Sequence, residues 1–365
     1  RRALASLVRA RYRVPDAEVS YVEQAVEDVV RTTAWNMGAV LDLGEDPALA
    51  PVRAALEEEI EEDRSWLLDL LSLLYDPGAV AIVKESLSTG SGRSSVYALE
   101  VMDLVVSPGL KPLVFPLLED QAYGPALRKL DAFVPRQKTS ALETLGAITG
   151  REYDRIGLFT RVLALETLGK VSPGIAPELL ASLYHPEPMI REVAALGIAR
   201  RDRGAWEAHR ARLRFDVRDR LDAVVAGAGD ADGADTLSVF GRARLLATVP
   251  EFAPLPSEVR VALAVSSEER LLRESQRLPN PREPKDSFYV LVEGGMEVLG
   301  GGSARLAPPA FFGVLPGSSS VEASGACRLV RLEPTRLFEL AGENLALLPG
   351  LFAACRLLSP DRDSA

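Results

Sequence analysis

Apolar positions in the first two thirds of the chain repeat with the period of an α-helix. The spacing i, i+3, i+4, i+7 is clear in three stretches, residues 19–30, 110–118 and 190–198. Turn signals such as Asp76-Pro77-Gly78 separate the helices. The pattern predicts an all-α region over residues 1–228, in which short helices are stacked on one another.

The pattern changes in the last third, where apolar and mixed positions alternate as they do in β-strands. The clearest strand covers residues 288–293, and Gly294-Gly295 after it predicts a two-residue hairpin turn to a strand at 296–299. Pro334 opens an amphipathic helix. These signals predict a small β-roll with flanking helices over residues 237–365. The fold class expected for the whole chain is therefore multidomain α+β.

A short segment rich in alanine, glycine and aspartate, residues 229–236, lies between the two regions. Small and acidic residues of this kind do not support a helix or a core. The sequence therefore predicts three parts: a helical repeat domain (1–228), a linker (229–236) and a β-roll domain (237–365).

Two segments of the helical region resemble HEAT repeats. Residues 179–197 read LLASLYHPEPMIREVAALG, an apolar helix, a proline turn and an Ala-rich helix. Residues 113–120, LVFPLLED, resemble the first helix of another repeat, including its Pro116. In that family Arg191 would bond the preceding turn. The resemblance implies an α-solenoid, whose extended surface binds another protein.

The last third resembles the cyclic nucleotide-binding domain. The phrase VPEFAPLP at residues 249–256, the strands near Phe288 and the Phe311-Phe312-Gly313 motif carry this resemblance. In the family a short cassette follows that motif: a Glu binds the ribose hydroxyl, an Arg pairs with the cyclic phosphate, and backbone N–H groups cradle it.

The cassette of this chain departs from the family pattern. Val314 stands at the Glu position, the intervening residues are largely missing, and no Lys or Arg occurs between residues 306 and 327. We expect a fold that has lost its nucleotide, so no cofactor is predicted and cyclic nucleotide is disfavoured. The vestigial ligand-binding positions are Phe312, Gly313, Val314, Leu315, Ser318, Ser319 and Ser320. Only a guanidinium from elsewhere, such as Arg305 or an arginine of the helical repeat domain, would restore the missing charge.

Composition removes most enzyme mechanisms. The chain of 365 residues has a net charge of −10, a pI near 5.0, two cysteines and two histidines. No metal spacing, catalytic triad, P-loop or Gly-x-Ser-x-Gly motif is present, so no catalytic residue, no metal site and no enzyme is predicted. The acidic balance argues against nucleic acid as a partner. No stretch is long enough to insert into a membrane.

Two charged segments have alternative interpretations. Residues 57–63 are a run of acids broken by Ile60, interpreted as the solvated face of a helix rather than a binding tail. Residues 200–220 are rich in arginine. A basic groove for nucleic acid is one hypothesis, but interleaved acids favour a salt-bridged final solenoid helix, with Asp216 and Arg220 at i, i+4 spacing.

The leading hypothesis is a non-enzymatic regulatory or protein-interaction module. Its order of domains resembles the soluble C-terminal region of bacterial ATP/ADP translocase-like proteins. That resemblance implies a cytoplasmic location, a tether to the inner membrane through a missing N-terminal region, and a transporter domain of the same polypeptide as a partner. The alternative hypothesis is a ligand sensor that binds a cyclic nucleotide or another small anion through Ser318, Ser319 and Ser320. An enzyme based on carboxylate or serine chemistry is the third and least supported.

Overall fold

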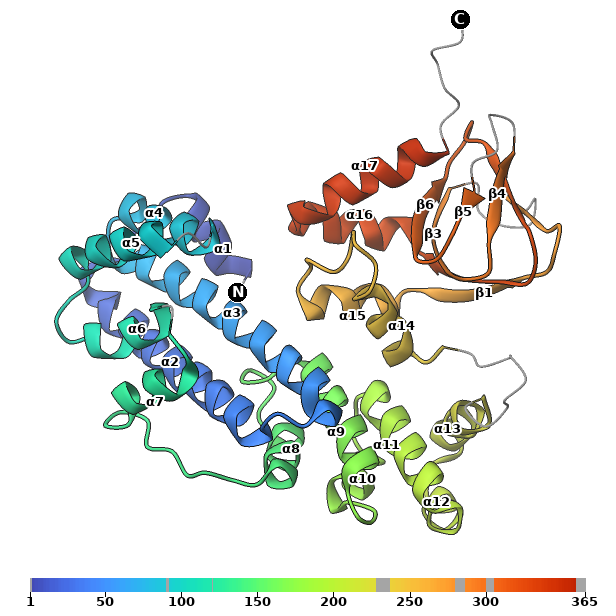
Figure 1. Ribbon diagram of the computed structural model, residues 1–365, viewed down its shortest axis with the longest axis horizontal. Helices are drawn as coiled ribbons and strands as arrows, with labels where there is room; N and C mark the ends of the chain where they lie inside the picture. The colour runs from blue at the N-terminus through green and yellow to red at the C-terminus, as the bar shows by residue number, and fades with distance from the viewer. Residues whose placement is uncertain are drawn as a thin grey trace, which may run out of the picture. The chain divides into compact units, whose positions relative to one another are not determined.

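The computed structural model describes residues 2–89, 92–119, 121–227, 237–279, 286–299 and 305–358. The chain forms two compact units, Arg1–Pro173 and Gly174–Ala365 (Figure 1). The first is helical, and the second combines helices with β-sheets, which confirms the α+β layout. The predicted linker 229–236 lies outside the described residues, and the predicted domain boundaries stay a prediction.

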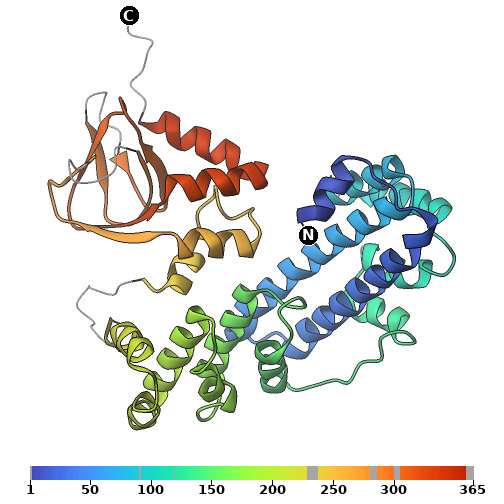
Figure 2. The same ribbon diagram turned by 180° about the vertical axis from the view of Figure 1, so that it is seen from behind.

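The first unit is organised around two long helices that pack side by side, α2 (Val19–Leu43) and α3 (Ala50–Leu74). The remaining helical elements of this unit are shorter: α1 (Arg2–Arg9), η1 (Asp16–Glu18), η2 (Pro47–Leu49), α4 (Pro77–Thr89), α5 (Gly92–Val105), α6 (Lys111–Leu118), α7 (Tyr123–Leu130), α8 (Ala141–Gly150) and α9 (Leu158–Val171). Figure 2 shows the α2–α3 pair from behind. Helices adjacent in sequence also pack as pairs, α4 with α5 and α8 with α9.

Helix α2 forms where the sequence predicts it, because a stripe of valines faces the core. Val26, Val29 and Val30 are buried. The helix ends at Gly44, whose φ of +66° is a conformation that glycine adopts at low cost. At 25 residues α2 is longer than the short helices that the sequence predicts for this region, and its buried residues extend from Val26 to Leu43.

The acidic run 57–63 lies on helix α3, as predicted, but its interpretation as a solvated face is wrong in part. Glu59 is 6% exposed and Asp63 is 2% exposed. Glu59 accepts hydrogen bonds from the backbone N–H of Gly157 and from the Thr160 hydroxyl, and Asp63 accepts one from Thr33. Buried carboxylates are tolerated when such donors surround them.

The second unit begins with helices α10 (Pro177–Ser182) and α11 (Pro188–Arg201), which form the predicted helix-turn-helix. Arg191 donates to the carbonyl oxygens of His185 (2.8 Å) and Pro186 (3.0 Å). The side chain therefore holds the turn that precedes its own helix, and its predicted structural role is confirmed.

The Arg-rich segment is not one helix. It comprises the end of α11, α12 (Arg203–Arg210) and α13 (Phe215–Gly227). Arg220 pairs with Glu192 of α11 (2.7 Å) instead of Asp216, and Asp216 pairs with Arg214 (3.2 Å). The segment contains many ion pairs, as expected, but a tertiary pair with Glu192 and a local pair with Arg214 replace the predicted i, i+4 pair.

The β-roll consists of two four-stranded antiparallel sheets with strand orders β1-β8-β3-β6 and β2-β7-β4-β5. The strands are β1 (Glu268–Leu272), β2 (Arg277–Leu278), β3 (Ser287–Glu293), β4 (Met296–Leu299), β5 (Arg305–Leu306), β6 (Ala310–Val314), β7 (Ser320–Ala323) and β8 (Cys327–Leu332). The flanking helices are α14 (Val239–Leu246), α15 (Ser257–Val265), α16 (Pro334–Glu343), η3 (Leu345–Leu347) and α17 (Leu348–Leu357). This is the layout that the sequence predicts.

The predicted hairpin at Gly294-Gly295 is wrong, although both of its strands exist. β3 pairs with β6 and β8, whereas β4 pairs with β5 and β7, so the turn carries the chain from one sheet to the other. Gly294 has φ +88°, and a Cβ there would lie 2.5 Å from the Ala326 carbonyl oxygen. The tight approach of the β7–β8 turn therefore requires glycine at this position.

Candidate functional site in the loop between β6 and β7

The predicted cassette positions are divided between two strands and a tight turn. Phe312, Gly313 and Val314 belong to β6, and Ser320 begins β7. Between them the chain makes a turn around Gly317, whose φ is +85°. No helix separates the two strands, because only five residues, 315–319, connect them.

The three predicted positions on β6 are packed within the fold and do not line a ligand site. Phe312 is fully buried and its ring stacks on that of Tyr289 at a centroid distance of 5.7 Å. Val314, at the position where the family has a Glu, is 2% exposed and lies in the same apolar core. Gly313 is needed for packing, since a Cβ there would lie 2.9 Å from the Phe288 ring. Phe312 and Val314 therefore fill the roll with hydrocarbon.

The backbone donors of the turn are bonded within the fold. The Leu315 N–H donates to the Ser318 hydroxyl oxygen (3.1 Å), and the Ser318 N–H donates back to the Leu315 carbonyl (3.0 Å). The Ser319 N–H donates to the carbonyl of Leu358 (2.7 Å). Three groups that a phosphate cradle would offer to an anion are thereby already satisfied.

The residue that accepts from Ser319 is also part of the core of the roll. Leu358 follows helix α17 and is 1% exposed, packed in the apolar core with Phe312 and Val314. The sequence analysis did not single out Leu358. Its signal was an apolar pair, Leu357-Leu358, at the end of the last amphipathic helix.

The guanidinium considered as a substitute partner for a phosphate, Arg305, lies on the outer face of the second sheet. Arg305 pairs in register with Glu297, Glu297 with Glu322, and Glu322 with Arg277. Alternate residues on the same strands, such as Met296 and Leu306, fill the core. The Arg305 side chain lies over Gly295, within 3.2 Å of where a Cβ would stand.

The polar chemistry of the turn is modest. Ser318, Ser319 and Ser320 are half-buried. The hydroxyls of Ser319 and Ser320 make no hydrogen bond within the described part of the chain.

Among the described residues, no group of three or more His, Cys, Asp or Glu side chains could hold a metal ion. None of the helices within the described ranges is long and apolar enough to cross a bilayer.

Comparison with known proteins yields structural neighbours only. No family model matches the chain, and no curated protein matches it. Solved structures similar to part of it include three bacterial proteins. A cyclic nucleotide-binding-like protein from Brucella abortus is 19% identical, covering 28% of this chain and 97% of its own, with a TM-score of 0.23.

The other two neighbours are domains of transcriptional regulators. The sensor domain of a regulator from Pseudomonas aeruginosa is 20% identical over 30% of this chain and 80% of its own, with a TM-score of 0.26. The N-terminal domain of a regulator from Streptomyces coelicolor A3(2) is 20% identical over 33% of this chain and 99% of its own, also at 0.26. The case for a function therefore depends on the residues of the loop itself.

Proposed function

We propose that this chain is a non-enzymatic regulatory module whose β-roll has kept a cyclic nucleotide-binding-like fold and lost its nucleotide. The observation that carries the proposal is the internal bonding of the β6–β7 turn. The N–H groups of Leu315, Ser318 and Ser319 already have acceptors within the fold. A cyclic phosphate would have to compete with those acceptors. No Lys or Arg in residues 306–327 would compensate for the hydrogen bonds that are lost.

The energetic consequence is large relative to ordinary ligand affinities. Each charge-assisted hydrogen bond contributes about 1.5–3 kcal/mol. A change of about 1.4 kcal/mol corresponds to a factor of ten in affinity. Losing the contact to the ribose and the contact to the phosphate would shift a micromolar site into the millimolar range. The roll then serves as a folded platform and not as a sensor.

The proposed partner is another protein, bound by the helical repeats. Support comes from the pairing of sequence-adjacent helices, α4 with α5, α8 with α9 and α10 with α11, as in a HEAT-like array. The Arg191 bond to its preceding turn also fits that repeat. A transporter domain of the same polypeptide, and a cytoplasmic site on the inner membrane, stay predictions of the resemblance.

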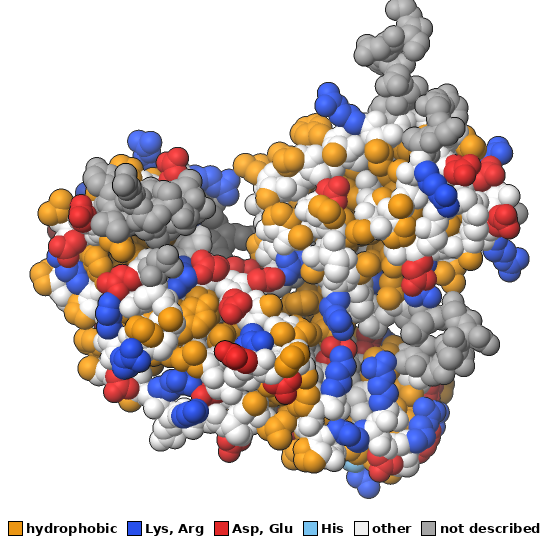
Figure 3. Space-filling view, viewed as in Figure 1, with side chains coloured by type: hydrophobic (Ala, Val, Ile, Leu, Met, Phe, Trp, Pro, Cys, Tyr) orange, Lys and Arg blue, Asp and Glu red, His pale blue; other side chains and the backbone are white. Residues whose placement is uncertain are grey.

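The arginine-rich helices α11–α13 give little support for nucleic acid. Basic side chains gather over this part in Figure 3, with acidic ones among them. Arg210 binds Asp222 through two nitrogens (2.5 and 2.6 Å), and Arg220 binds Glu192. Phosphate binding would have to break these pairs, so the proposal includes no nucleic-acid partner.

A ligand sensor is the second candidate, favoured by one observation. The Ser319 and Ser320 hydroxyls lie half-buried beside the turn and have no hydrogen bond within the described residues. They would have to bind a small anion without a cationic side chain from the turn.

Isothermal titration calorimetry with cyclic AMP, cyclic GMP and cyclic di-GMP tests the proposal. We expect no saturable heat with any of the three nucleotides up to about 1 mM, the concentration that corresponds to a binding free energy near −4 kcal/mol. A cyclic nucleotide-binding domain of known affinity serves as the positive control. A micromolar dissociation constant for any of the three would overturn the proposal in favour of the sensor.

A further inference from the structure

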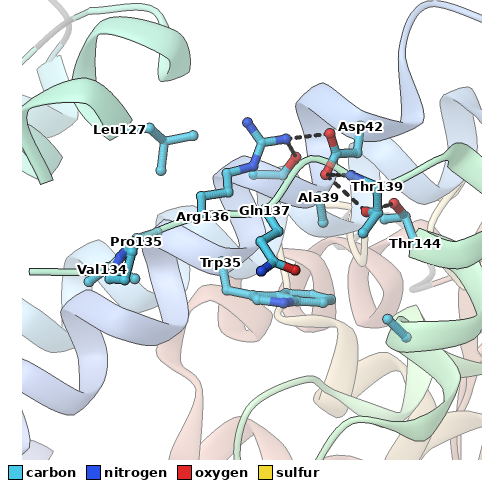
Figure 4. A pocket seen from close by; sticks show the side chains of 13 residues that line it. Trp35, Ala39, Asp42, Leu127, Val134, Pro135, Arg136, Gln137, Thr139 and Thr144 are labelled. Atoms are coloured by element: carbon cyan, nitrogen blue, oxygen red, sulfur yellow. Dashed lines mark hydrogen bonds and ion pairs between the residues drawn. The ribbon is translucent and has the colours of Figure 1, made fainter. Parts of the chain in front are cut away.

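A cavity of about 370 Å³ lies in the first unit, far along the sequence from the β-roll. Its walls are side chains of helices α2, α7 and α8, and the extended connection that follows α7 covers it (Figure 4). Small residues on the helices, including Gly38, Ala39 and Ala147, leave the space empty of protein atoms. The volume falls within the range of about 300–1,000 Å³ typical of small-molecule sites.

The covering segment is bonded to helix α2 mainly through one carboxylate. Asp42, whose side chain is 5% exposed, pairs with the Arg136 guanidinium. It also accepts hydrogen bonds from the Thr139 hydroxyl (3.1 Å) and the Thr139 N–H (3.3 Å). Arg136 donates in addition to the Gly38 carbonyl (2.9 Å). Figure 4 shows these contacts at one end of the cavity.

This arrangement leaves the cavity electrically neutral. The charges of Asp42 and Arg136 compensate each other, and each is already hydrogen-bonded. Gly38 makes the pair possible, because a Cβ there would lie 2.7 Å from the Arg136 Nε. A charged ligand would therefore find no free partner among these two side chains, and its desolvation would go uncompensated.

The floor of the cavity is an aromatic ring with one polar side chain near it. The half-buried Trp35 lines the cavity, and the Gln137 side chain lies near its ring (Figure 4). The Arg151 guanidinium lies 3.7 Å from the centroid of the same ring. Since Arg151 does not line the cavity, it covers indole surface outside the cavity. Burial of the Arg151 guanidinium lowers its pKa to about 10.

Gln137 is exposed, and its amide, like the indole N–H of Trp35, has no hydrogen-bond partner in the described part of the chain. Its amide presents a donor and an acceptor side by side. A flat ring that stacks on Trp35 would meet this amide at its edge.

The geometry points to a binding site for a neutral, bicyclic heteroaromatic compound, stacked on Trp35 and hydrogen-bonded by Gln137. The apolar walls favour a ligand with a flat hydrocarbon surface. The neutral Asp42–Arg136 pair disfavours a ligand with a net charge, and the Gln137 amide favours one with a ring nitrogen at its edge. The site belongs to the helical unit and does not depend on the function proposed for the β-roll.

Saturation-transfer NMR on the full chain tests this site, with adenine and indole as probes. We expect saturable binding of at least one probe, with a dissociation constant of about 1 mM or tighter, near −4 kcal/mol. Two variants should weaken it. Ala147→Phe fills the cavity from an exposed position on α8, and Gln137→Ala removes the amide.

Ala81→Phe is the matched control, since Ala81 is exposed on α4 and does not line the cavity. The proposal requires that Ala147→Phe weakens probe binding at least tenfold, while Ala81→Phe leaves it unchanged. Circular dichroism of each variant verifies that the helices are intact. The absence of saturable binding for both probes, or equal affinity in wild type and Ala147→Phe, overturns the proposal.

Discussion

Replacing Arg328 with alanine is expected to lower the free energy of unfolding of the second unit by about 3–5 kcal/mol, the range found when one partner of a buried ion pair is removed. Arg328 is 8% exposed, and its Nε lies 3.2 Å from Glu269 Oε1. The Glu269 side chain is also 8% exposed. Without the guanidinium, this carboxylate would remain buried with the Leu237 N–H (2.7 Å) and the nearby charge of Arg242 to compensate it.

The pair is an ion pair without a well-aligned hydrogen bond, because neither atom has a hydrogen-bond partner. Its main effect is to neutralise charge where β1 meets β8. A double replacement, Arg328→Met with Glu269→Met, should recover much of the loss, since an apolar pair needs no compensation.

Urea unfolding followed by circular dichroism measures this effect. Arg336→Ala is the control, because the Arg336–Glu339 pair lies on the surface of α16 and contributes at most about 1 kcal/mol. Equal destabilisation by Arg328→Ala and Arg336→Ala would show that the buried pair has no special role.

Replacing Glu59 with alanine should lower the free energy of unfolding of the first unit by about 2–3 kcal/mol, the scale of hydrogen bonds to a charged group. Helix α9 begins after Gly157, which has no side chain to cap it. Glu59 of α3 supplies the cap, accepting from the Gly157 N–H (2.9 Å) and the Thr160 hydroxyl (2.7 Å). The negative charge of Glu59 also interacts favourably with the positive end of the α9 helix dipole.

Three variants separate this role from a general effect of removing charge. Glu57→Ala changes an exposed acid of the same helix and should alter stability by less than about 0.5 kcal/mol. Glu59→Gln keeps an acceptor and should fall between the two. Gly157→Ala should destabilise as well, since its Cβ would lie 2.7 Å from Glu59 Oε1. If Glu59→Ala unfolds at the same urea concentration as Glu57→Ala, the capping role is refuted.

The local sequence pattern was sufficient to predict the helices and strands, but not to predict which strands pair with one another. The strand at 288–293, the helix after Pro334 and the bond from Arg191 to its turn depend on residues close in sequence, and all three are found. The hairpin at Gly294-Gly295 failed because turn residues do not reveal which strands pair. β3 is apolar on both faces and lies between β6 and β8.

Long-range contacts explain the other differences. Glu59 and Asp63 were predicted to be solvated, because the hydrogen-bond donors that compensate the buried Glu59 lie about a hundred residues away, at Gly157 and Thr160. The candidate site shows the same limit. The sequence revealed the missing charge of the cassette. It did not reveal that the Leu358 carbonyl would accept a hydrogen bond from the Ser319 N–H, or that the Leu358 side chain would pack in the core of the roll.

Hydrogen exchange of the backbone amides of Leu315, Ser318 and Ser319, measured with and without cyclic AMP, tests the central claim most directly. If these groups are bonded within the fold, Ser319 exchanges slowly in the free protein because its acceptor is Leu358, and saturating nucleotide changes none of the three rates. Fast exchange in the free protein, slowed when cyclic AMP is added, would show that the turn keeps its donors for a phosphate and would contradict the account.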